Sequence, residues 1–406
     1  MKQQYVPAFS LNRQIKEHRE AFIKALDGVF EPEAFIGGPL VSEFEKKLAT
    51  YLKTSYVIGC NSGTDALWMA MHALQIPKDA IVLTTPFSFI ASSSEIVAHG
   101  AHPVFIDIEE DTFNINPQLV SLWLEKHAFM KDGVATHKAT NFPVVGILPV
   151  DLFGQCADYS ILREIADTWN LWLVEDCAQA IGARMGDKMA GTFGNIGTLS
   201  FYPTKNLGAF GDGGACVTDD PVLAERLMQV RHHGRKANYD YEGLGINSRL
   251  DAFQATLLTE KLPLLDAANQ RRRAIAAHYD AQLRGLPGLK LPREIIGSHV
   301  YHQYTMLVHD EQGNSRRQAL EQHLIAHGVQ TRIFYPQPLP TVGYLRTHPA
   351  LITQNPVTDA AATSVLSLPM WPELREDEVQ HVCDRIKEFF ATVVKESVEN
   401  DIATAT

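Results

Sequence analysis

The sequence predicts an α/β fold in two domains, because short apolar strands alternate with helical stretches through its first two thirds. The strands are expected at 55–60, 81–85, 103–107, 144–150, 171–175 and 197–202. Nearly continuous apolar strands that are separated by helices indicate a mostly parallel sheet, buried on both faces. At 406 residues the chain is also too long for one ordinary core. We therefore expect a large α/β domain and a smaller second domain.

The elements outside that series follow in order along the chain. A helical pattern from Asp65 to Leu74 follows the first strand, and a polar stretch is expected to form a surface loop at 126–141. One long helix, interrupted at Pro263, is expected at 250–283. The second region then has a strand, a helix, a strand and a final amphipathic helix, at 303–308, 315–327, 329–334 and about 375–394. The predicted parts are a large domain, a small α+β domain and a polar, frayed tail, at 1–258, 259–395 and 396–406.

The composition is that of a globular protein and excludes several function classes. Hydrophobic residues make up 45% of the chain and charged residues 20%. The net charge of -11 argues against a nucleic-acid or anionic-membrane partner. The first residues have no signal-peptide core and no segment reaches membrane-spanning length, so a cytoplasmic location is expected. The five cysteines are scattered, which predicts buried thiols rather than disulfides or metal ligands.

Lys205 carries the strongest chemical signal in the sequence. It stands among glycine and small residues in the segment 200–214, beyond an apolar run that ends in Glu175 and Asp176. Pyridoxal phosphate requires a lysine that bonds to its aldehyde and an acid that pairs with its pyridine nitrogen. The segment therefore suggests an attachment site for that cofactor. The alternative is a solvated lysine in a glycine-rich turn.

Three further segments fit a cofactor site. Residues 61–64 (Asn-Ser-Gly-Thr) stand between a strand and a helix, where free amides bind phosphate and where a Ser/Thr N-cap is also common; both interpretations can hold. Residues 175–179 end a strand, so Asp176 is a candidate partner of the pyridine nitrogen and Gln179 of the ring oxygen. The alternative for Asp176 is a helix cap. Phe89, after another strand, is a candidate to stack on the ring, or else a core residue.

Other site types lack their sequence signatures. No strand is followed by G-x-G-x-x-G, and the chain contains neither a P-loop nor an H-E-x-x-H motif. The pair His232-His233 has no accompanying metal-ligand spacing and precedes a glycine, as in a loop. We therefore expect no metal site.

With these residues in place, the chain resembles the DegT/DnrJ/EryC1/StrS family of sugar aminotransferases from Val6 to about Phe390. The resemblance depends on six ordered motifs, at 38–45, 61–67, 149–155, 175–179, 200–214 and 245–251. It implies the fold of the aspartate aminotransferase class (fold type I), with a large α/β domain and a smaller C-terminal α+β domain. It also implies pyridoxal 5'-phosphate as the cofactor.

The resemblance assigns a role to each matching residue. Lys205 would bond to the cofactor and move the proton between cofactor and substrate, while Asp176 would pair with the pyridine nitrogen. Gln179 would pair with the ring oxygen, and the phosphate would be bound by Gly63, Thr64 and Ser200.

A second set of assignments concerns the neighbouring subunit and the substrate. Asn247 resembles the residue that reaches the phosphate of the adjacent subunit, which implies a homodimer with two composite sites. Arg249 would contact an acidic donor or substrate, or else support the subunit interface. Tyr335 would contact the sugar.

The implied reaction transfers an amino group from L-glutamate to a nucleotide-linked keto-sugar. Segments 300–304, 335–339 and 366–370 are more similar to members that aminate 3-keto sugars, although Phe334 stands where some of those members have histidine. The alternatives are a 4-keto-sugar aminotransferase, a related sugar dehydratase and a non-catalytic regulatory protein. Lys205 argues against the dehydratase, since those enzymes have histidine at this position.

Overall fold

A seven-stranded sheet forms the centre of the larger part of the molecule. The computed structural model describes residues 4–31, 33, 35–310, 312–347 and 353–404. In spatial order the strands are β1 (Tyr56–Cys60), β11 (Gly214–Thr218), β10 (Ile196–Ser200), β7 (Trp172–Asp176), β6 (Val144–Leu148), β2 (Ile81–Thr84) and β3 (His102–Phe105). The run from β10 to β3 is parallel, whereas β11 is antiparallel to both its neighbours. The predicted α/β class is confirmed; β11 had no counterpart among the predicted strands.

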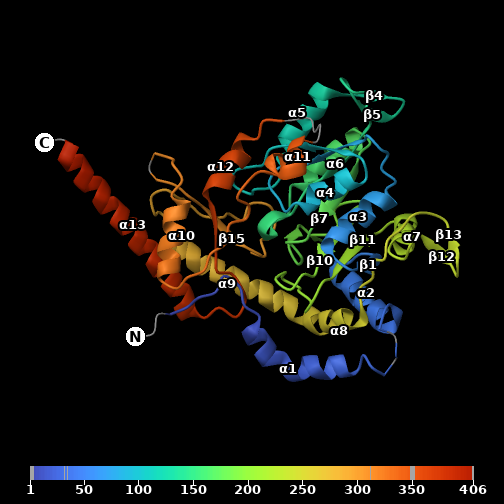
Figure 1. Ribbon diagram of the computed structural model, residues 1–406, viewed down its shortest axis with the longest axis horizontal. Coiled ribbons are helices and arrows are strands. Elements are labelled where there is room, and N and C mark those ends of the chain that lie inside the picture. The colour runs from blue at the N-terminus through green and yellow to red at the C-terminus, as the bar shows by residue number, and fades with distance from the viewer. Residues whose placement is uncertain (1–3, 32, 34, 311, 348–352, 405–406) are drawn as a thin grey trace.

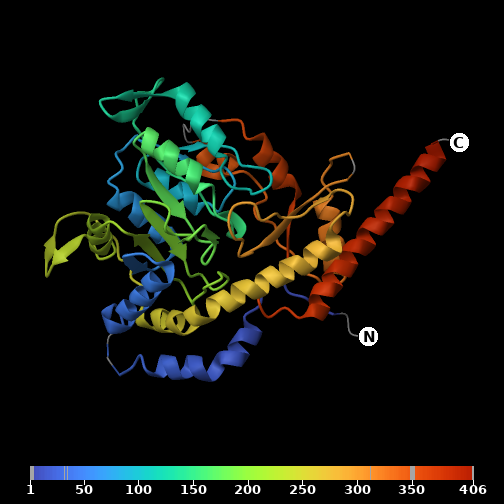
Figure 2. The ribbon, with the colours of Figure 1, turned by 180° about the vertical axis from the view of Figure 1, so that it is seen from behind.

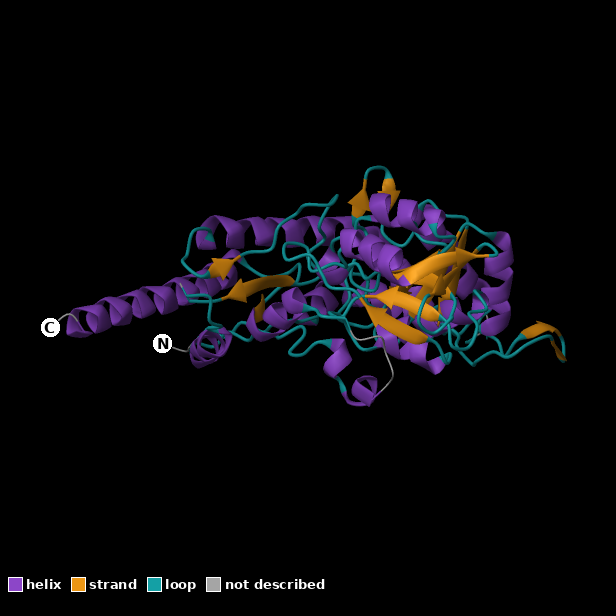
Figure 3. Ribbon diagram, turned by 90° about the horizontal axis from the view of Figure 1, so that it is seen from above, coloured by secondary structure: helices purple, strands orange, loops and turns teal. Residues whose placement is uncertain are grey.

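Helices cover both faces of this sheet (Figure 3). Neighbouring strand residues such as Leu173 and Val174 belong to two different cores, as the alternation of side chains in a strand requires. One core includes α2 (Gly38–Leu52), α5 (Pro117–His127), α6 (Tyr159–Thr168) and α8 (Ala252–Lys261). The other includes α3 (Gly63–Ala73), α4 (Ala91–Ala98) and α7 (Pro221–Val230). A sheet buried on both faces explains why its strands are apolar almost throughout.

Local sequence fixes where several of these helices begin. Asn116 precedes Pro117 at the start of α5, and Asp220 precedes Pro221 at the start of α7. In both cases the Asx side chain accepts hydrogen bonds from the two amides that follow the proline. Proline loses nothing at this position, because its missing N–H would have no partner in the helix.

The second part of the molecule packs against a long helix (Figures 1 and 2). α8 is followed by a single 3-10 turn, η2 (Leu262–Leu264), and by α9 (Leu265–Leu283), so the predicted interruption at Pro263 is confirmed. A small antiparallel sheet of β14 (Leu289–Lys290), β15 (Tyr304–Val308) and β16 (Val365–Leu368) shares a core with α9, α10 (Arg317–Ala326) and α13 (Glu376–Thr404). The predicted domain boundary at residue 258 falls inside α8 and stays a prediction.

Three predicted elements are wrong. Segment 126–141 is not a loop: it forms the hairpin of β4 (Ala128–Lys131) and β5 (Val134–His137), because the two-residue turn Asp132-Gly133 has the positive φ angles that such a hairpin requires. Segment 329–334 makes isolated bridges at Val329 and Arg332 instead of a strand. The predicted tail continues α13 as far as Thr404, since this segment contains no glycine or proline that would end a helix.

The remaining elements are short or peripheral. They are α1 (Asn12–Asp27), η1 (Leu152–Gly154), β8 (Arg184–Met185), β9 (Lys188–Met189), β12 (Arg235–Ala237), β13 (Asp240–Tyr241), η3 (Leu339–Thr341), α11 (Gly343–Thr347) and α12 (Pro356–Ser364). All five cysteines are buried and free, as predicted. Among the described residues, no helix combines the length and the apolar character that crossing a membrane would need.

Candidate active site

A cavity of about 720 Å³ opens where the strands of the parallel run end. β7 ends at Asp176 and β10 at Ser200, and both residues line the cavity. Ligands in open α/β sheets gather at this edge. The cavity contains all the predicted site residues except Asn247 and Arg249, namely Gly63, Thr64, Phe89, Asp176, Gln179, Ser200, Lys205 and Tyr335.

Lys205 lies in the wall of this cavity, within a turn that its backbone N–H closes on the Tyr202 carbonyl at 2.8 Å. It is half-buried, so the alternative of a fully solvated surface lysine is wrong. Burial lowers the pKa of Lys205 to about 8, and the nearby Asp176 carboxylate opposes that shift. An amine with this pKa is partly neutral at physiological pH, which a nucleophile requires.

Asp176 is buried at the end of β7 and is held from two directions. Its Oδ2 accepts a hydrogen bond from Ser92 Oγ at 2.8 Å, and its Oδ1 accepts one from the Ala178 N–H at 3.2 Å. Burial raises the pKa of Asp176, while these two bonds and the charge of Lys205 lower it. The pKa of Asp176 stays raised overall, and the two hydrogen bonds and Lys205 oppose the effect of burial.

Sequence reasoning missed Ser92. It lies inside α4, and its hydroxyl is also within 2.8 Å of Ser88 Oγ. The signal that could have found it is the run of three serines at 92–94 in the helix that follows a strand end.

The first turn of α3 faces Ser200. Ser62 caps this helix, since its side chain accepts the Asp65 N–H at 3.0 Å, so the N-cap interpretation of 61–64 is confirmed. A Cβ on Gly63 would lie 2.7 Å from the Ser200 Cβ, which only glycine avoids without displacing the serine. The helix start and Ser200 Oγ thus form one polar corner, suited to an anion.

Gln179 and Tyr335 meet on another wall of the cavity. Gln179 Oε1 accepts the Phe153 N–H at 2.8 Å, and Gln179 Nε2 donates to the Tyr335 hydroxyl at 3.2 Å. These bonds fix which end of the amide faces Tyr335. Burial raises the pKa of Tyr335, so this side chain is a neutral phenol.

Phe89 and its neighbour Phe87 differ in burial. Phe87 is fully buried and meets the Tyr335 ring edge-on, with a centroid distance of 6.1 Å. Phe89 is 55% exposed and lines the cavity. Phe89 is therefore not a core residue, and its predicted stacking on a ring stays a prediction.

Asn247 and Arg249 lie outside the cavity of their own chain. Asn247 is exposed and forms a backbone bridge with His232, at the base of the β12–β13 hairpin. The hairpin itself projects from the molecule (Figure 3). This position fits a residue that serves a neighbouring subunit, and the assignment stays a prediction.

His302 also lines the cavity, and the sequence pointed to it only within the segment 300–304. Its Nδ1 lies 3.1 Å from Asn206 Oδ1, and it is buried. Burial lowers the pKa of His302 well below its usual value, and the charge of Lys205 adds to that shift. His302 is therefore a neutral imidazole beside Lys205.

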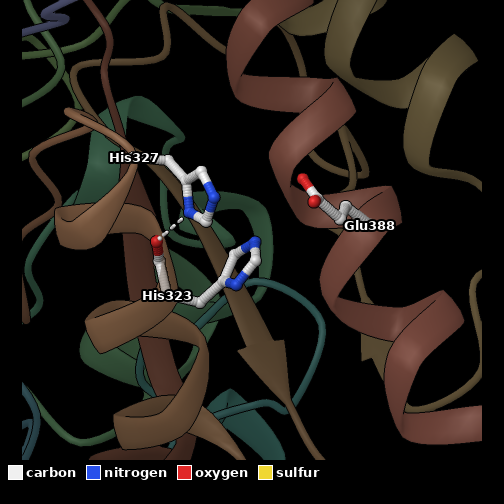
Figure 4. A group of neighbouring side chains, drawn as sticks. All are labelled: His323, His327 and Glu388. Atoms are coloured by element: carbon white, nitrogen blue, oxygen red, sulfur yellow. Dashed lines mark hydrogen bonds between the residues drawn. The ribbon is translucent and has the colours of Figure 1, made fainter. Parts of the chain in front are cut away.

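Two groups of possible metal ligands occur among the described residues. His323 on α10 and His327, the residue that follows this helix, face Glu388 on α13 (Figure 4). The Glu388 carboxylate pairs with Arg385 at 2.6 Å, and His327 Nδ1 donates to the His323 carbonyl. The other group is Asp151, Glu175 and Cys177, which are buried. That the chain binds no metal stays a prediction.

Comparison with known proteins identifies the family. The model of the DegT/DnrJ/EryC1/StrS aminotransferase family matches residues 16–387. The chain belongs to this family. The resemblance that the six motifs indicated is confirmed.

Three relatives cover nearly the whole chain. A pleiotropic regulatory protein of Geobacillus stearothermophilus is 38% identical, over 95% of this chain and 98% of its own. The dTDP-3-amino-3,4,6-trideoxy-alpha-D-glucose transaminase of Streptomyces venezuelae is 37% identical, over 95% and 96%. The UDP-N-acetyl-3-dehydro-alpha-D-glucosamine 3-aminotransferase of Acidithiobacillus ferrooxidans is 36% identical, over 94% and 97%.

Solved structures confirm the fold. The crystal structure of DesV from S. venezuelae superposes with a TM-score of 0.87 at 36% identity and covers 95% of this chain and 98% of that one. The structure of NtdA from Bacillus subtilis, with bound cofactor PMP, has a TM-score of 0.84 at 29% identity and covers 96% and 86%. The chain thus has the fold of the pyridoxal-phosphate-dependent sugar aminotransferases, as predicted.

Proposed function

We propose that this protein transfers an amino group from L-glutamate to a nucleotide-linked 3-keto sugar, with pyridoxal 5'-phosphate as its cofactor. The observation that supports the cofactor most strongly is that Lys205 and Asp176 line one cavity at the strand ends. The two residues are 29 positions apart in the sequence, and each faces the space that the aromatic ring of such a cofactor needs.

The residues of the cavity fit this group. Lys205 Nζ would bond to the aldehyde carbon, Asp176 would hold the proton of the pyridine nitrogen, and Gln179 Nε2 would donate to the ring oxygen. The phosphate would lie in the polar corner formed by Gly63, Thr64 and Ser200. When bound, the cofactor supplies a ring that withdraws electrons from the neighbouring carbon.

The chain's own residues handle the proton. Lys205 Nζ would serve as the base that accepts a proton from the donor's α-carbon. A pKa near 8 matches this role, because a base is most effective when its pKa is close to the working pH. Ser92 and the Ala178 N–H donate to the oxygens of Asp176 and so favour its ionised form, which the pairing with a protonated ring nitrogen requires.

The 3-keto preference is supported by the two relatives named above whose names specify a 3-amino or 3-dehydro nucleotide sugar, and by segments 300–304, 335–339 and 366–370. Tyr335, from the second of these segments, lines the cavity, and its hydroxyl accepts a hydrogen bond from Gln179. We assign it to the sugar, next to Phe334, which also lines the cavity.

A homodimer with shared sites completes the proposal. Asn247 is exposed at the base of the projecting hairpin and outside the cavity of its own chain, which supports its assignment to the phosphate of a second subunit. Mixing Lys205→Ala with Asn247→Ala protein tests this arrangement. If the sites are shared, half of the sites in mixed dimers recover both intact residues and activity returns, whereas self-contained sites would leave the mixture inactive.

A single half-reaction tests the substrate. Enzyme that has been converted to the pyridoxamine form with L-glutamate is mixed with a 3-keto or a 4-keto nucleotide sugar, and the visible absorbance of the pyridoxal form is followed. Its return with the 3-keto sugar alone supports the proposal. Return of this absorbance with the 4-keto sugar alone would change the assigned substrate to a 4-keto sugar. Return with neither sugar would favour a regulatory protein.

A further inference from the structure

Two carboxyl groups lie directly behind the cofactor acid in the protein core. Asp151 and Glu175 are both 0% exposed, and their carboxylate oxygens lie within 4.8 Å of each other. Glu175 precedes Asp176 on β7, and successive side chains of a strand point to opposite faces. Asp176 therefore faces the cavity, while Glu175 faces Asp151.

Glu175 is surrounded by donors. Its Oε2 accepts the Phe193 N–H at 2.8 Å, and its Oε1 accepts the Gly191 N–H. Both donors belong to the turn between β9 and β10. Backbone amides cannot reverse their direction, so this site requires an acceptor at each carboxyl oxygen.

Asp151 has donors on one oxygen only. Its Oδ1 accepts the Ala157 N–H and the Tyr159 hydroxyl, each at 2.9 Å. Its Oδ2 is buried and has no donor among the residues described. A buried oxygen of this kind is costly unless it carries a proton, and a protonated Oδ2 becomes a donor.

We propose that Asp151 carries a proton on Oδ2 and donates it to Glu175, and that this acid–carboxylate pair positions Asp176. The link to Asp176 is direct: the Asp151 N–H donates to the Asp176 carbonyl, and the Asp176 N–H donates to the Pro149 carbonyl, both at 3.0 Å. The pair thus locks the strand ends that carry the cofactor acid. Its importance for Asp176 rests on the proposed function, whereas the proton placement does not.

The charges around the pair agree with one shared proton. Burial and the charge of Glu175 raise the pKa of Asp151 well above its usual value. The other titratable groups that face the pair are Tyr159, Cys156 and Cys177, and burial raises the pKa of each, so they are neutral. One proton leaves a single negative charge behind Asp176, which limits the repulsion that would otherwise raise the pKa of Asp176.

Two isosteric substitutions locate the proton. Asp151→Asn preserves the donor at Oδ2 and the acceptor at Oδ1, so the dissociation constant of the cofactor and the urea midpoint of the cofactor-free protein should stay near wild type. Glu175→Gln turns an NH₂ group toward a backbone N–H. It should raise the dissociation constant about tenfold or more, since an unmatched buried donor costs about 1–3 kcal/mol. The reverse order would place the proton on Glu175 and overturn the proposal, as would equal losses in both variants.

The pH dependence of unfolding decides the matter even if Glu175→Gln does not fold. Above about pH 4 the unfolded wild-type chain loses the Asp151 proton, whereas the folded state keeps it. The free energy of unfolding of wild type therefore falls, relative to that of Asp151→Asn, as the pH rises. The ratio of the two unfolding constants should change by up to about tenfold per pH unit between pH 5 and 7. A constant ratio would show that Asp151 is ionised in the fold. Because unfolding needs no cofactor, this result stands apart from the proposed function.

Discussion

Replacing Ser92 with alanine removes a hydrogen bond to the acid that would hold the cofactor's ring nitrogen. Ser92 Oγ donates to Asp176 Oδ2 at 2.8 Å, and both residues are buried. A hydrogen bond to a charged group contributes about 1.5–3 kcal/mol. At 1.36 kcal/mol per pKa unit, its loss raises the pKa of Asp176 by about one to two units.

The pH profile of the half-reaction with L-glutamate measures this change. Wild type loses activity as the pH falls through the pKa of Asp176, because a protonated acid no longer holds the ring proton. In Ser92→Ala that loss should begin about one to two pH units higher, with kcat affected more than KM.

Ser93→Ala is the matched control. Ser93 is the next residue of α4 and equally buried, but its hydroxyl donates to the Ile90 carbonyl at 3.1 Å. Its profile should stay within about 0.3 pH units of wild type, since its loss leaves Asp176 unchanged. Equal shifts in both variants, or no shift in Ser92→Ala, would refute the role given to Ser92.

Three further predictions concern the cavity. Lys205→Ala should abolish both half-reactions while the melting temperature stays close to that of cofactor-free wild type; measurable turnover would remove Lys205 from the reaction. Gly63→Ala should weaken cofactor binding about tenfold or more, because its Cβ would lie 2.7 Å from the Ser200 Cβ, whereas Gly243→Ala, which has open space, should not change it. The rate at which pyridoxal phosphate bonds to cofactor-free protein should rise with pH around a midpoint of about 8, as burial of the Lys205 amine lowers its pKa to that value; a midpoint near 10.5 would show an ordinary amine.

Most strands of the sheet could be predicted because strands that are buried on both faces are apolar almost throughout. The apolar runs that end at residues 175 and 202 correspond to β7 and β10, and the residues just beyond such ends line the cavity. β11 was not predicted because it begins at Gly214, the last residue of the glycine-rich segment 200–214, and glycine weakens a strand pattern. The hairpin at 126–141 was missed although the sequence contains a local signal for it, the two-residue turn Asp132-Gly133, because the polar composition of the segment favoured a loop.

The residues of the candidate site also fall into those that the sequence could predict and those that it could not. Lys205, Asp176 and Gln179 belong to local motifs, and the structure brings them to one cavity. Ser92 and Asp151 act through partners far away in the sequence, at positions 176 and 175, so only the assembled sheet reveals them. A sequence shows which residues have suitable chemistry, whereas the fold decides which of them support the others.

The most direct test of the central claim is to locate the covalent bond to the cofactor. Borohydride reduction of the holoprotein, followed by proteolysis and mass spectrometry, should give a pyridoxyl label on the peptide that contains Lys205. Lys261 is the internal control, because burial lowers its pKa to about 8 as well. It lies outside the cavity, and its Nζ donates to the Gly208 carbonyl. A label on Lys205 alone is the predicted result; a label on Lys261, or none on Lys205, would contradict it.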